Sequence, residues 1–298
     1  MIPHRGALLG RRAALAGAAA LALSRRADAA APLKGPSPSD WRALEARLEG
    51  GRLGAYALNV DTGASLGWRA DERFAMCSTF KLLLAGAVLS RVDAGRERLD
   101  RKLPITRDDL RPHAPVVERH LAEGSADVET LCAAAVQVSD NSAANLLLRT
   151  LGGPRGLTRY IRTLGDRTTR LDRWEVELNS AIPGDVRDTT TPGAMTGSCR
   201  TLLTGRALSP ASRERLAGWR TGAATGLTRI RQGLPAGWRA GDKTGAGSRN
   251  TINDVAVAWP PSGGPLFVTV YTTGGAAPQP VREAVMAEIG RQAAQALV

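Results

Sequence analysis

The sequence is poor in cysteine, histidine and lysine, with three, three and four of each among 298 residues. Three cysteines leave at least one thiol unpaired, and neither the cysteines nor the histidines stand at the spacings of a metal site. After the N-terminal segment, no hydrophobic run is long enough to cross a bilayer. We therefore expect no metal, no cofactor and no membrane-spanning domain in the mature chain.

Acidic residues are also in short supply, since 28 Asp and Glu face 40 Lys and Arg, for a net charge of +12. A basic balance can indicate nucleic-acid binding. Here the arginines are dispersed, with no basic helix and no interleaved aromatic residues, which argues against it. Arginine in place of lysine, together with abundant alanine and glycine, is more typical of compositional bias.

The first 30 residues have the pattern of a signal peptide. Basic residues, an apolar stretch and a small-residue cleavage motif follow one another, as Arg5, Arg11 and Arg12, residues 13–23, and Ala27-Asp28-Ala29. The paired arginines allow the twin-arginine route, and the Sec route is the alternative. The predicted mature protein, residues 31–298, is exported to the periplasm or secreted. Removing residues 1–30 lowers the net charge by four, to +8.

The remaining roughly 270 residues are enough for one large domain or two lobes. Hydrophobic patterning predicts strands near both ends, a terminal helix and a helical middle, at residues 53–60, 65–69, 239–243, 252–259 and 266–272, then 280–296, with 71–220 between them. This order predicts an α/β protein. The sequence Gly63-Ala64-Ser65-Leu66-Gly67 has the form of a hydrolase elbow, but it lies between two strands and predicts a hairpin turn.

Lysine is the rare basic residue, and two lysines lie in short motifs. Lys81 follows Ser78 by three residues at the head of the apolar run 82–89, which predicts a helix. Residues three apart share a helix face, so the Ser78 hydroxyl and the Lys81 amine can come within hydrogen-bonding reach. A serine with an adjacent base is the requirement for covalent catalysis. The alternative is a helix-capping serine and a lysine whose stem covers a buried face.

Ser139-Asp140-Asn141 separates two alanine-rich helical stretches. If the break is extended, Ser139 and Asn141 face one side and Asp140 the other, which would present a hydroxyl and an amide to a cleft. Ordinary turn chemistry explains the same three residues.

Lys243-Thr244-Gly245 precedes Ala246 and Gly247, a pattern that suits an exposed strand edge where a ligand approaches the backbone. Its lysine and threonine suit a carboxylate, although a hairpin end is the simpler interpretation. Glu175 and Asn179 are four residues apart and share a face if the segment makes a helical turn. A carboxylate and an amide on one side could hold a water molecule, and a solvated helical acid is the alternative.

In this order and spacing, the four motifs resemble those of the class A serine β-lactamases. The resemblance covers roughly residues 40–298, and residues 170–175 and 185–190 resemble the two ends of the family's Ω loop, clamped by an Arg173–Asp188 ion pair. It implies a five-stranded antiparallel sheet flanked by helices and formed from both termini, with an all-helical lobe inserted. The implied α/β lobe comprises residues 41–70 and 221–298, and the helical lobe residues 71–220, with the active site between them.

The resemblance also implies the catalytic roles. Ser78 would attack the β-lactam carbonyl, with an oxyanion hole formed by the backbone N–H groups of Ser78 and Ala246. The serine proton would go to Lys81 or, through a water, to Glu175. Ser139 would pass a proton to the leaving nitrogen. Glu175 would then activate the water that hydrolyses the acyl-enzyme.

The implied substrate-binding residues surround these four. Asn179 would orient Glu175, Asn141 would bind the substrate's side-chain amide, and the substrate carboxylate would meet the Lys243-Thr244-Gly245 segment. Ile252 stands where many members carry a further cation, and Arg229 is the upstream substitute found in other relatives. His113 stands at the gate position usually held by Tyr or Trp.

Other positions depart from the family pattern. Val176 replaces the proline that often follows the catalytic glutamate, so the local peptide geometry there can differ. Cys77 and Cys132 match half-cystines of some relatives, but their partner positions here are Gly247 and Ala85, so neither bridge can form.

The predicted function is hydrolysis of the β-lactam amide bond of antibiotics through a serine acyl-enzyme, by a monomer that needs no cofactor. The nearest alternative is a penicillin-binding D-Ala-D-Ala carboxypeptidase or transpeptidase, which lacks the deacylating water. A non-catalytic cell-wall-binding module is the second alternative, and it leaves Ser78, Lys81 and Glu175 unexplained.

Overall fold

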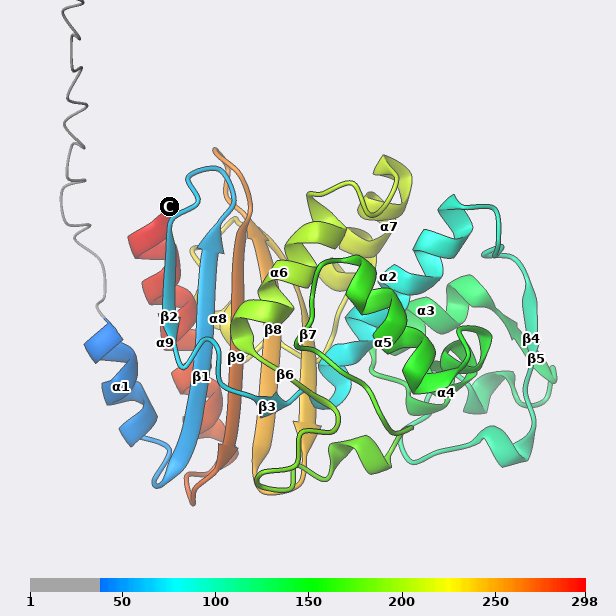
Figure 1. Ribbon diagram of the computed structural model, residues 1–298, viewed down its shortest axis with the longest axis horizontal. Coiled ribbons are helices and arrows are strands. Elements are labelled where there is room, and N and C mark those ends of the chain that lie inside the picture. Colours follow the sequence, from blue (N-terminus) through cyan, green and yellow to red (C-terminus); the bar gives the residue numbers. More distant parts are fainter. Residues whose placement is uncertain (1–37) are drawn as a thin grey trace, which may run out of the picture. The chain divides into compact units, whose positions relative to one another are not determined.

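The computed structural model describes residues 38–298, so the predicted signal peptide lies outside the described residues. A five-stranded sheet with strand order β2-β1-β9-β8-β7 is antiparallel at every pairing, as Figure 1 shows. Its strands are β1 (Gly51–Asn59), β2 (Ser65–Trp68), β7 (Arg239–Gly247), β8 (Thr251–Trp259) and β9 (Leu266–Gly274). The predicted sheet, formed from both ends of the chain, is confirmed.

Helices supply most of the remaining structure. They are α1 (Pro38–Ala46), α2 (Phe80–Asp93), α3 (Val128–Gln137), α4 (Asn141–Thr150), α5 (Gly153–Thr163), α6 (Pro192–Leu203), α7 (Pro210–Thr221), α8 (Ile230–Gly233) and α9 (Gln279–Leu297), with 3₁₀ turns η1 (Cys77–Thr79), η2 (Arg107–Asp109), η3 (Glu118–His120) and η4 (Glu177–Asn179). Two short ribbons pair β3 (Phe74–Ala75) with β6 (Thr189–Thr190), and β4 (Lys102–Pro104) with β5 (Ser125–Asp127).

The turn between β1 and β2 confirms the predicted hairpin. Leu58 pairs with Ser65, and the Asn59 side chain accepts hydrogen bonds from the backbone of Asp61 and Thr62. Gly63 has φ 70°, a left-handed conformation that favours glycine. The serine of the elbow-like motif therefore begins a strand, where a hydrolase elbow would need a turn into a helix.

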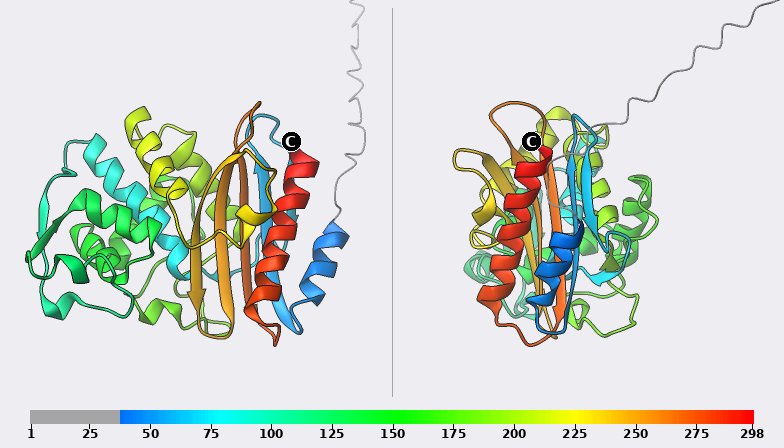
Figure 2. Two further views of the ribbon diagram at one scale, coloured as in Figure 1. Left: turned by 180° about the vertical axis from the view of Figure 1, so that it is seen from behind. Right: turned by 90° about the vertical axis from the view of Figure 1, so that its left-hand side faces the viewer.

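The main sheet separates two hydrophobic clusters. On β9, Val268 and Val270 pack with α1 and α9 on one face, while Phe267 and Tyr271 join the larger cluster on the other. This alternation follows from the two-residue period of a strand. In Figures 1 and 2, α1 and α9 cover the first face.

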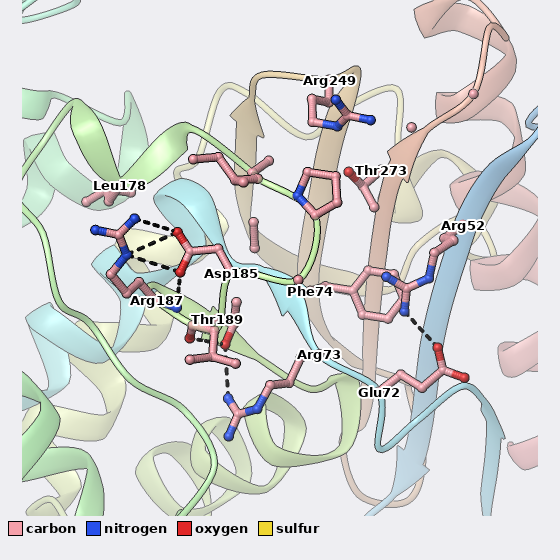
Figure 3. Close-up of a pocket in the computed structure, with 18 of the residues that line it drawn as sticks. Arg52, Glu72, Arg73, Phe74, Leu178, Asp185, Arg187, Thr189, Arg249 and Thr273 are labelled. Carbon is pink, nitrogen blue, oxygen red and sulfur yellow. Dashed lines mark hydrogen bonds and ion pairs between the residues drawn. The ribbon is translucent and has the colours of Figure 1, made fainter.

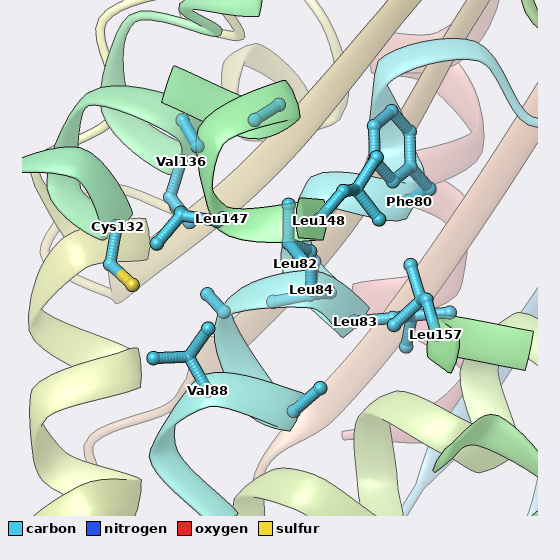
Figure 4. Packing of buried hydrophobic residues seen from close by; sticks show 14 of the residues in the cluster. Phe80, Leu82, Leu83, Leu84, Val88, Cys132, Val136, Leu147, Leu148 and Leu157 are labelled. Atoms are coloured by element: carbon cyan, nitrogen blue, oxygen red, sulfur yellow. The ribbon is translucent and has the colours of Figure 1, made fainter. Parts of the chain in front are cut away.

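Helix α2 lies at the centre of the larger cluster and is buried from Phe80 to Leu89. Its leucines meet side chains of α3, α4 and α5, as Figure 4 shows for Leu82, Val136, Leu147 and Leu157. A helix that is apolar on every side belongs inside a core, which explains why the sequence shows an unbroken apolar run there.

The larger cluster contains side chains of the sheet as well as of the helices. A boundary between an α/β lobe and a helical lobe, at residues 70 and 221, therefore stays a prediction. Within residues 38–298, no helix combines the length and the apolar character needed to cross a membrane.

Candidate active site

Ser78 and Lys81 lie where η1 continues into α2. The Thr79 hydroxyl donates to Met76 O at 2.7 Å, and Asn253 of β8 donates its side-chain amide to Ala75 O at 2.9 Å. The first bond closes the turn, and the second holds it against the sheet. The Lys81 side chain is fully buried, and Ser78 is 9% exposed.

Both groups meet at one carboxylate oxygen. Glu175 Oε1 lies 3.3 Å from Ser78 Oγ, which donates to it, and 3.0 Å from Lys81 Nζ. Among residues 38–298, no direct hydrogen bond joins Ser78 to Lys81, so the direct contact expected from their spacing is absent. The lysine amine instead donates to Ser139 and Asn141 as well as meeting Glu175.

Glu175 is held at its side chain and at its backbone. Asn179 donates its side-chain amide to Glu175 Oε2 at 2.7 Å, so the predicted shared face of these residues is present. Asn145 accepts from Glu175 N at 3.0 Å and donates to Glu175 O at 2.9 Å. The peptide bond to Val176 is cis. Sequence reasoning missed Asn145, although it lies four residues after Asn141 and so on the same face of α4.

The Ser139-Asp140-Asn141 segment separates its side chains as predicted. Ser139 and Asn141 contact Lys81 Nζ, whereas Asp140 caps α4 and also accepts from Val116 N and Val117 N. The backbone is not extended as expected, because Ser139 has φ 61°. The reversal of the chain lets a side-chain cap start α4 immediately afterwards.

Lys243 reaches the same place from β7. Its Nζ donates to Ser139 Oγ at 3.1 Å and to Thr244 O at 3.0 Å. Burial, together with the positive charge of Lys81, lowers the pKa of Lys243 to about 7. Burial also lowers the pKa of Lys81, against the opposing pull of Glu175. β7 is an edge strand, as expected, but it is not exposed along its length: residues 241–245 are buried, with η1 and α7 packed against the strand.

A cavity of about 300 Å³ opens beside these groups. Its lining residues are well separated along the chain and are Ser78, His113, Ser139, Asn141, Asn179, Thr225, Arg229, Thr244, Gly245 and Ala246. Lys81, Glu175 and Lys243 lie behind this lining. Sequence reasoning missed Thr225, which belongs to no motif and is placed by a 2.8 Å contact between its hydroxyl and that of Thr244.

Glycine at position 245 lets β7 approach the nucleophile. A Cβ there would lie 2.9 Å from Met76 O and 3.2 Å from Cys77 Cβ, closer than side chains normally pack. The approach brings Ala246 and Ser78 into the lining of one cavity. The backbone N–H groups of these two residues are the ones predicted to form the oxyanion hole.

Arg229 and His113 were predicted at positions where this chain departs from the family pattern, and both line the cavity. Arg229 is 7% exposed and donates to Asn253 O at 2.8 Å, so its guanidinium is held against β8. His113 has φ 62°, and its Nε2 lies 2.7 Å from Val138 O. Ile252 pairs with Ala246 and packs into the smaller hydrophobic cluster.

The predicted Ω-loop clamp is confirmed. Asp188 is fully buried and accepts from Arg173 Nε at 2.6 Å and from the backbone N–H groups of Asp172 and Arg173. These three hydrogen bonds join the two ends of residues 170–190, and the chain between them carries Glu175.

The three cysteines are buried free thiols. A Cβ at Gly247 would lie 2.7 Å from Cys77 Sγ, so the two positions are neighbours, as the family resemblance implies. Burial raises the pKa of the Cys199 thiol to about 11. Within residues 38–298, no three His, Cys, Asp or Glu side chains gather as metal ligands would.

Comparison with known proteins agrees with this geometry. The model of the β-lactamase enzyme family matches residues 39–297. An ancestral class A β-lactamase of Gram-negative bacteria is 55% identical, with a TM-score of 0.84 over 86% of this chain and 97% of that one. PenP of Rhodopseudomonas palustris, assigned to class A, is 50% identical, with a TM-score of 0.85 over 87% and 99%. The chain therefore belongs to the β-lactamase enzyme family, and its similarities are to class A.

Proposed function

We propose that Ser78 opens the β-lactam ring and that Glu175 activates the water that releases the product. The observation that carries this assignment is the position of Glu175 Oε1, within 3.3 Å of the Ser78 hydroxyl and 3.0 Å of the Lys81 amine. A carboxylate so close to the nucleophile is in reach of an acyl group formed on it. Its other oxygen is occupied by Asn179, which fixes the orientation of the carboxylate.

Acylation begins with loss of the Ser78 proton. Lys81 or Glu175 accepts it, because Glu175 Oε1 contacts the Ser78 hydroxyl and Lys81 contacts the same oxygen. The lowered pKa of Lys81 favours a neutral amine that can act as a base. The serine oxygen bonds to the ring carbonyl carbon while the N–H groups of Ser78 and Ala246 stabilise the oxyanion. The C–N bond then breaks, and its nitrogen receives a proton through Ser139, which contacts both lysines.

Deacylation uses the same carboxylate. Glu175 takes a proton from a water molecule, whose oxygen bonds to the acyl carbon, and the ester bond to Ser78 breaks as the serine regains a proton. The product is the ring-opened acid. Held by Asn145 and Asn179, Glu175 needs little reorganisation for this step.

Substrate recognition depends on charge at one end of the cavity. Lys243, Thr244 and Arg229 are suited to the carboxylate of the substrate, and Thr225 extends this group through its contact with Thr244. Asn141 is suited to the side-chain amide, and His113 forms the gate.

The test is turnover of a chromogenic cephalosporin by the purified protein. Multiple turnovers support the β-lactamase, a single stoichiometric burst would indicate a transpeptidase, and no reaction a binding module. We expect Glu175→Gln to acylate and then stall, with an acyl-enzyme that persists in mass spectra, because the water loses its base. Free turnover by this variant would refute the role of Glu175, and Ser78→Ala, which cannot acylate, is the matched control.

We also propose that the protein is exported as a monomer, through the Sec or twin-arginine route. The pattern of residues 1–30 supports export. Fusing residues 1–30 to a reporter enzyme that is active only outside the cytoplasm tests this, and an Arg11→Lys, Arg12→Lys double variant distinguishes the routes, because the twin-arginine route requires the pair.

A further inference from the structure

A second and larger cavity, of about 550 Å³, lies behind the active site. It is bounded by the Ω-loop segment 181–187, by Phe74 and by the ends of β1 and β9, as Figure 3 shows. We call it the rear cavity. None of its lining residues has a role in the proposed reaction, and its volume is within the range of small-molecule sites.

The rear cavity carries an excess of positive charge. Five arginines line it, at positions 52, 73, 173, 187 and 249, against the two acids Glu72 and Asp185. Each acid is already paired, Glu72 with Arg52 at 2.7 Å and Asp185 with Arg187 at 2.8 Å. These two carboxylates therefore leave other arginines of the cavity available to an added anion.

Two of the arginines have no carboxylate partner. Arg73 donates to Thr168 O and to the Thr189 hydroxyl, both at 2.9 Å. The Arg249 guanidinium makes no hydrogen bond or ion pair with any part of residues 38–298 and stands free of dashed contacts in Figure 3. These two cations are available to a ligand without breaking an existing pair.

The rear cavity also offers apolar surface to a ligand. The Arg52 guanidinium stacks over the Phe74 ring at 4.6 Å, which creates a flat wall. Ile182 and Val186 on the Ω loop line the cavity while remaining 51% and 48% exposed, so both aliphatic side chains are accessible to a ligand. Flat and aliphatic walls beside unpaired guanidinium groups are complementary to an aromatic ring that carries an acid group.

The rear cavity and the active site share a wall. Leu178 lines the rear cavity, and the next residue, Asn179, lines the active site and holds Glu175. Asn179 O also accepts from Ser248 N at 2.9 Å, and the following residue is Arg249. A ligand that draws Arg249 towards the Ω loop would act on the peptide next to the residue that orients Glu175.

We propose that the rear cavity binds an aromatic organic anion, and that the bound anion changes the rate of deacylation. The binding depends only on the cavity. The effect on deacylation rests on the proposed function of Glu175, so the two parts need separate measurements.

Binding is tested with the fluorescent aromatic sulfonate anilinonaphthalene sulfonate, titrated into the folded full-length mature enzyme. We expect Arg249→Glu to weaken binding at least about tenfold, because an attraction becomes a repulsion at the acid group. Val186→Ser should weaken it through loss of apolar contact. The matched control is Arg119→Glu, which makes the same charge change at an exposed arginine outside the cavity and should bind as the parent does.

Equal affinity in Arg249→Glu and the parent, or equal weakening in Arg119→Glu, would overturn the binding site. Circular dichroism of each variant separates a lost site from a lost fold. The titration is repeated on Glu175→Gln acylated with benzylpenicillin, and displacement by the acyl group would place the sulfonate in the active site and overturn the proposal.

Coupling is measured by cephalosporin turnover at increasing sulfonate concentration. For a substrate whose turnover is limited by deacylation, we expect kcat and KM to change by the same factor, so that kcat/KM and pre-steady-state acylation stay the same. Sulfonate binding without an effect on kcat would reject the coupling and leave the binding site standing. If the proposed function were wrong, turnover would be absent at zero sulfonate, while the fluorescence titration would still report on the cavity.

Discussion

Lys243 places a fully buried amine in the active site with no carboxylate hydrogen-bonded to it among residues 38–298. Its partners are a hydroxyl and a carbonyl oxygen, which stabilise an ammonium less than a carboxylate does. Burial and the charge of Lys81 therefore bring its pKa down to about 7. A substrate carboxylate would supply the missing negative charge.

The pH dependence follows from the sign of this shift. Above about pH 7 the free enzyme loses the Lys243 proton, and with it the cation that meets the substrate carboxylate, so kcat/KM for a penicillin should fall as pH rises through 7. Arginine stays protonated, so Lys243→Arg should move this fall to higher pH. Steady-state profiles of both proteins check the prediction, and superimposable alkaline limbs would contradict it.

The candidate catalytic residues could be predicted from the sequence alone. Ser78, Lys81, Glu175 and Lys243 stand in short motifs, and the structure gathers all four. Asn145 and Thr225 were missed because neither belongs to a motif. Each is placed by a hydrogen bond to a motif residue that lies further along the chain. Only the folded chain brings those partners together.

Among the elements, the Ω-loop segment depends on its clamp. Removing Arg173 leaves the Asp188 carboxylate buried with backbone donors alone. We expect Arg173→Met to lower the free energy of unfolding by about 3 kcal/mol, the usual cost of an uncompensated buried charge. Acyl-enzyme should also accumulate, because Glu175 lies within the clamped segment.

Thermal melts and burst kinetics of this variant provide the measurement. The double variant Arg173→Met, Asp188→Asn removes the orphaned charge and should recover part of the stability. If Arg173→Met were as stable as the parent, the ion pair would contribute nothing to the stability of the protein.

Two helical glycines should respond in opposite directions to alanine. At Gly197 in α6 a Cβ meets nothing within 4 Å, so Gly197→Ala should stabilise the protein by about 0.5–1 kcal/mol through helix propensity. At Gly233 in α8 a Cβ would lie 1.7 Å from Ala287 O of α9, so Gly233→Ala should destabilise by about 1–3 kcal/mol or more. Denaturant unfolding measures both, and a shift of the same sign in the two variants would contradict the packing of α8 on α9.

Across the whole molecule, the two ends of the described chain close one face of the sheet. Trp41 of α1 is 1% exposed and donates from its indole to Gln292 of α9 at 2.9 Å. The Asn59 side chain at the end of β1 donates to Leu297 O at 2.7 Å. The strand that carries Lys243 belongs to the sheet that these contacts support.

We therefore expect Trp41→Ala to lower the free energy of unfolding by about 3–5 kcal/mol, as large-to-small changes in a core do. Activity and secondary structure should be lost in a single thermal transition at a lower temperature. Leu227→Ala is the control, because Leu227 is 55% exposed. If both variants melt alike, the smaller hydrophobic cluster does not support the sheet.

The sequence by itself determined the strands, the helical middle and the motif residues, because two-residue and helical periodicities and short spacings are local properties of a chain. Only the tertiary structure decided which oxygen Ser78 and Lys81 share, how deeply β7 is buried and where the rear cavity lies. Those features depend on distances between residues about a hundred or more positions apart, such as Ser78 and Glu175, and on the desolvation that packing imposes. Neither quantity is encoded in any single segment.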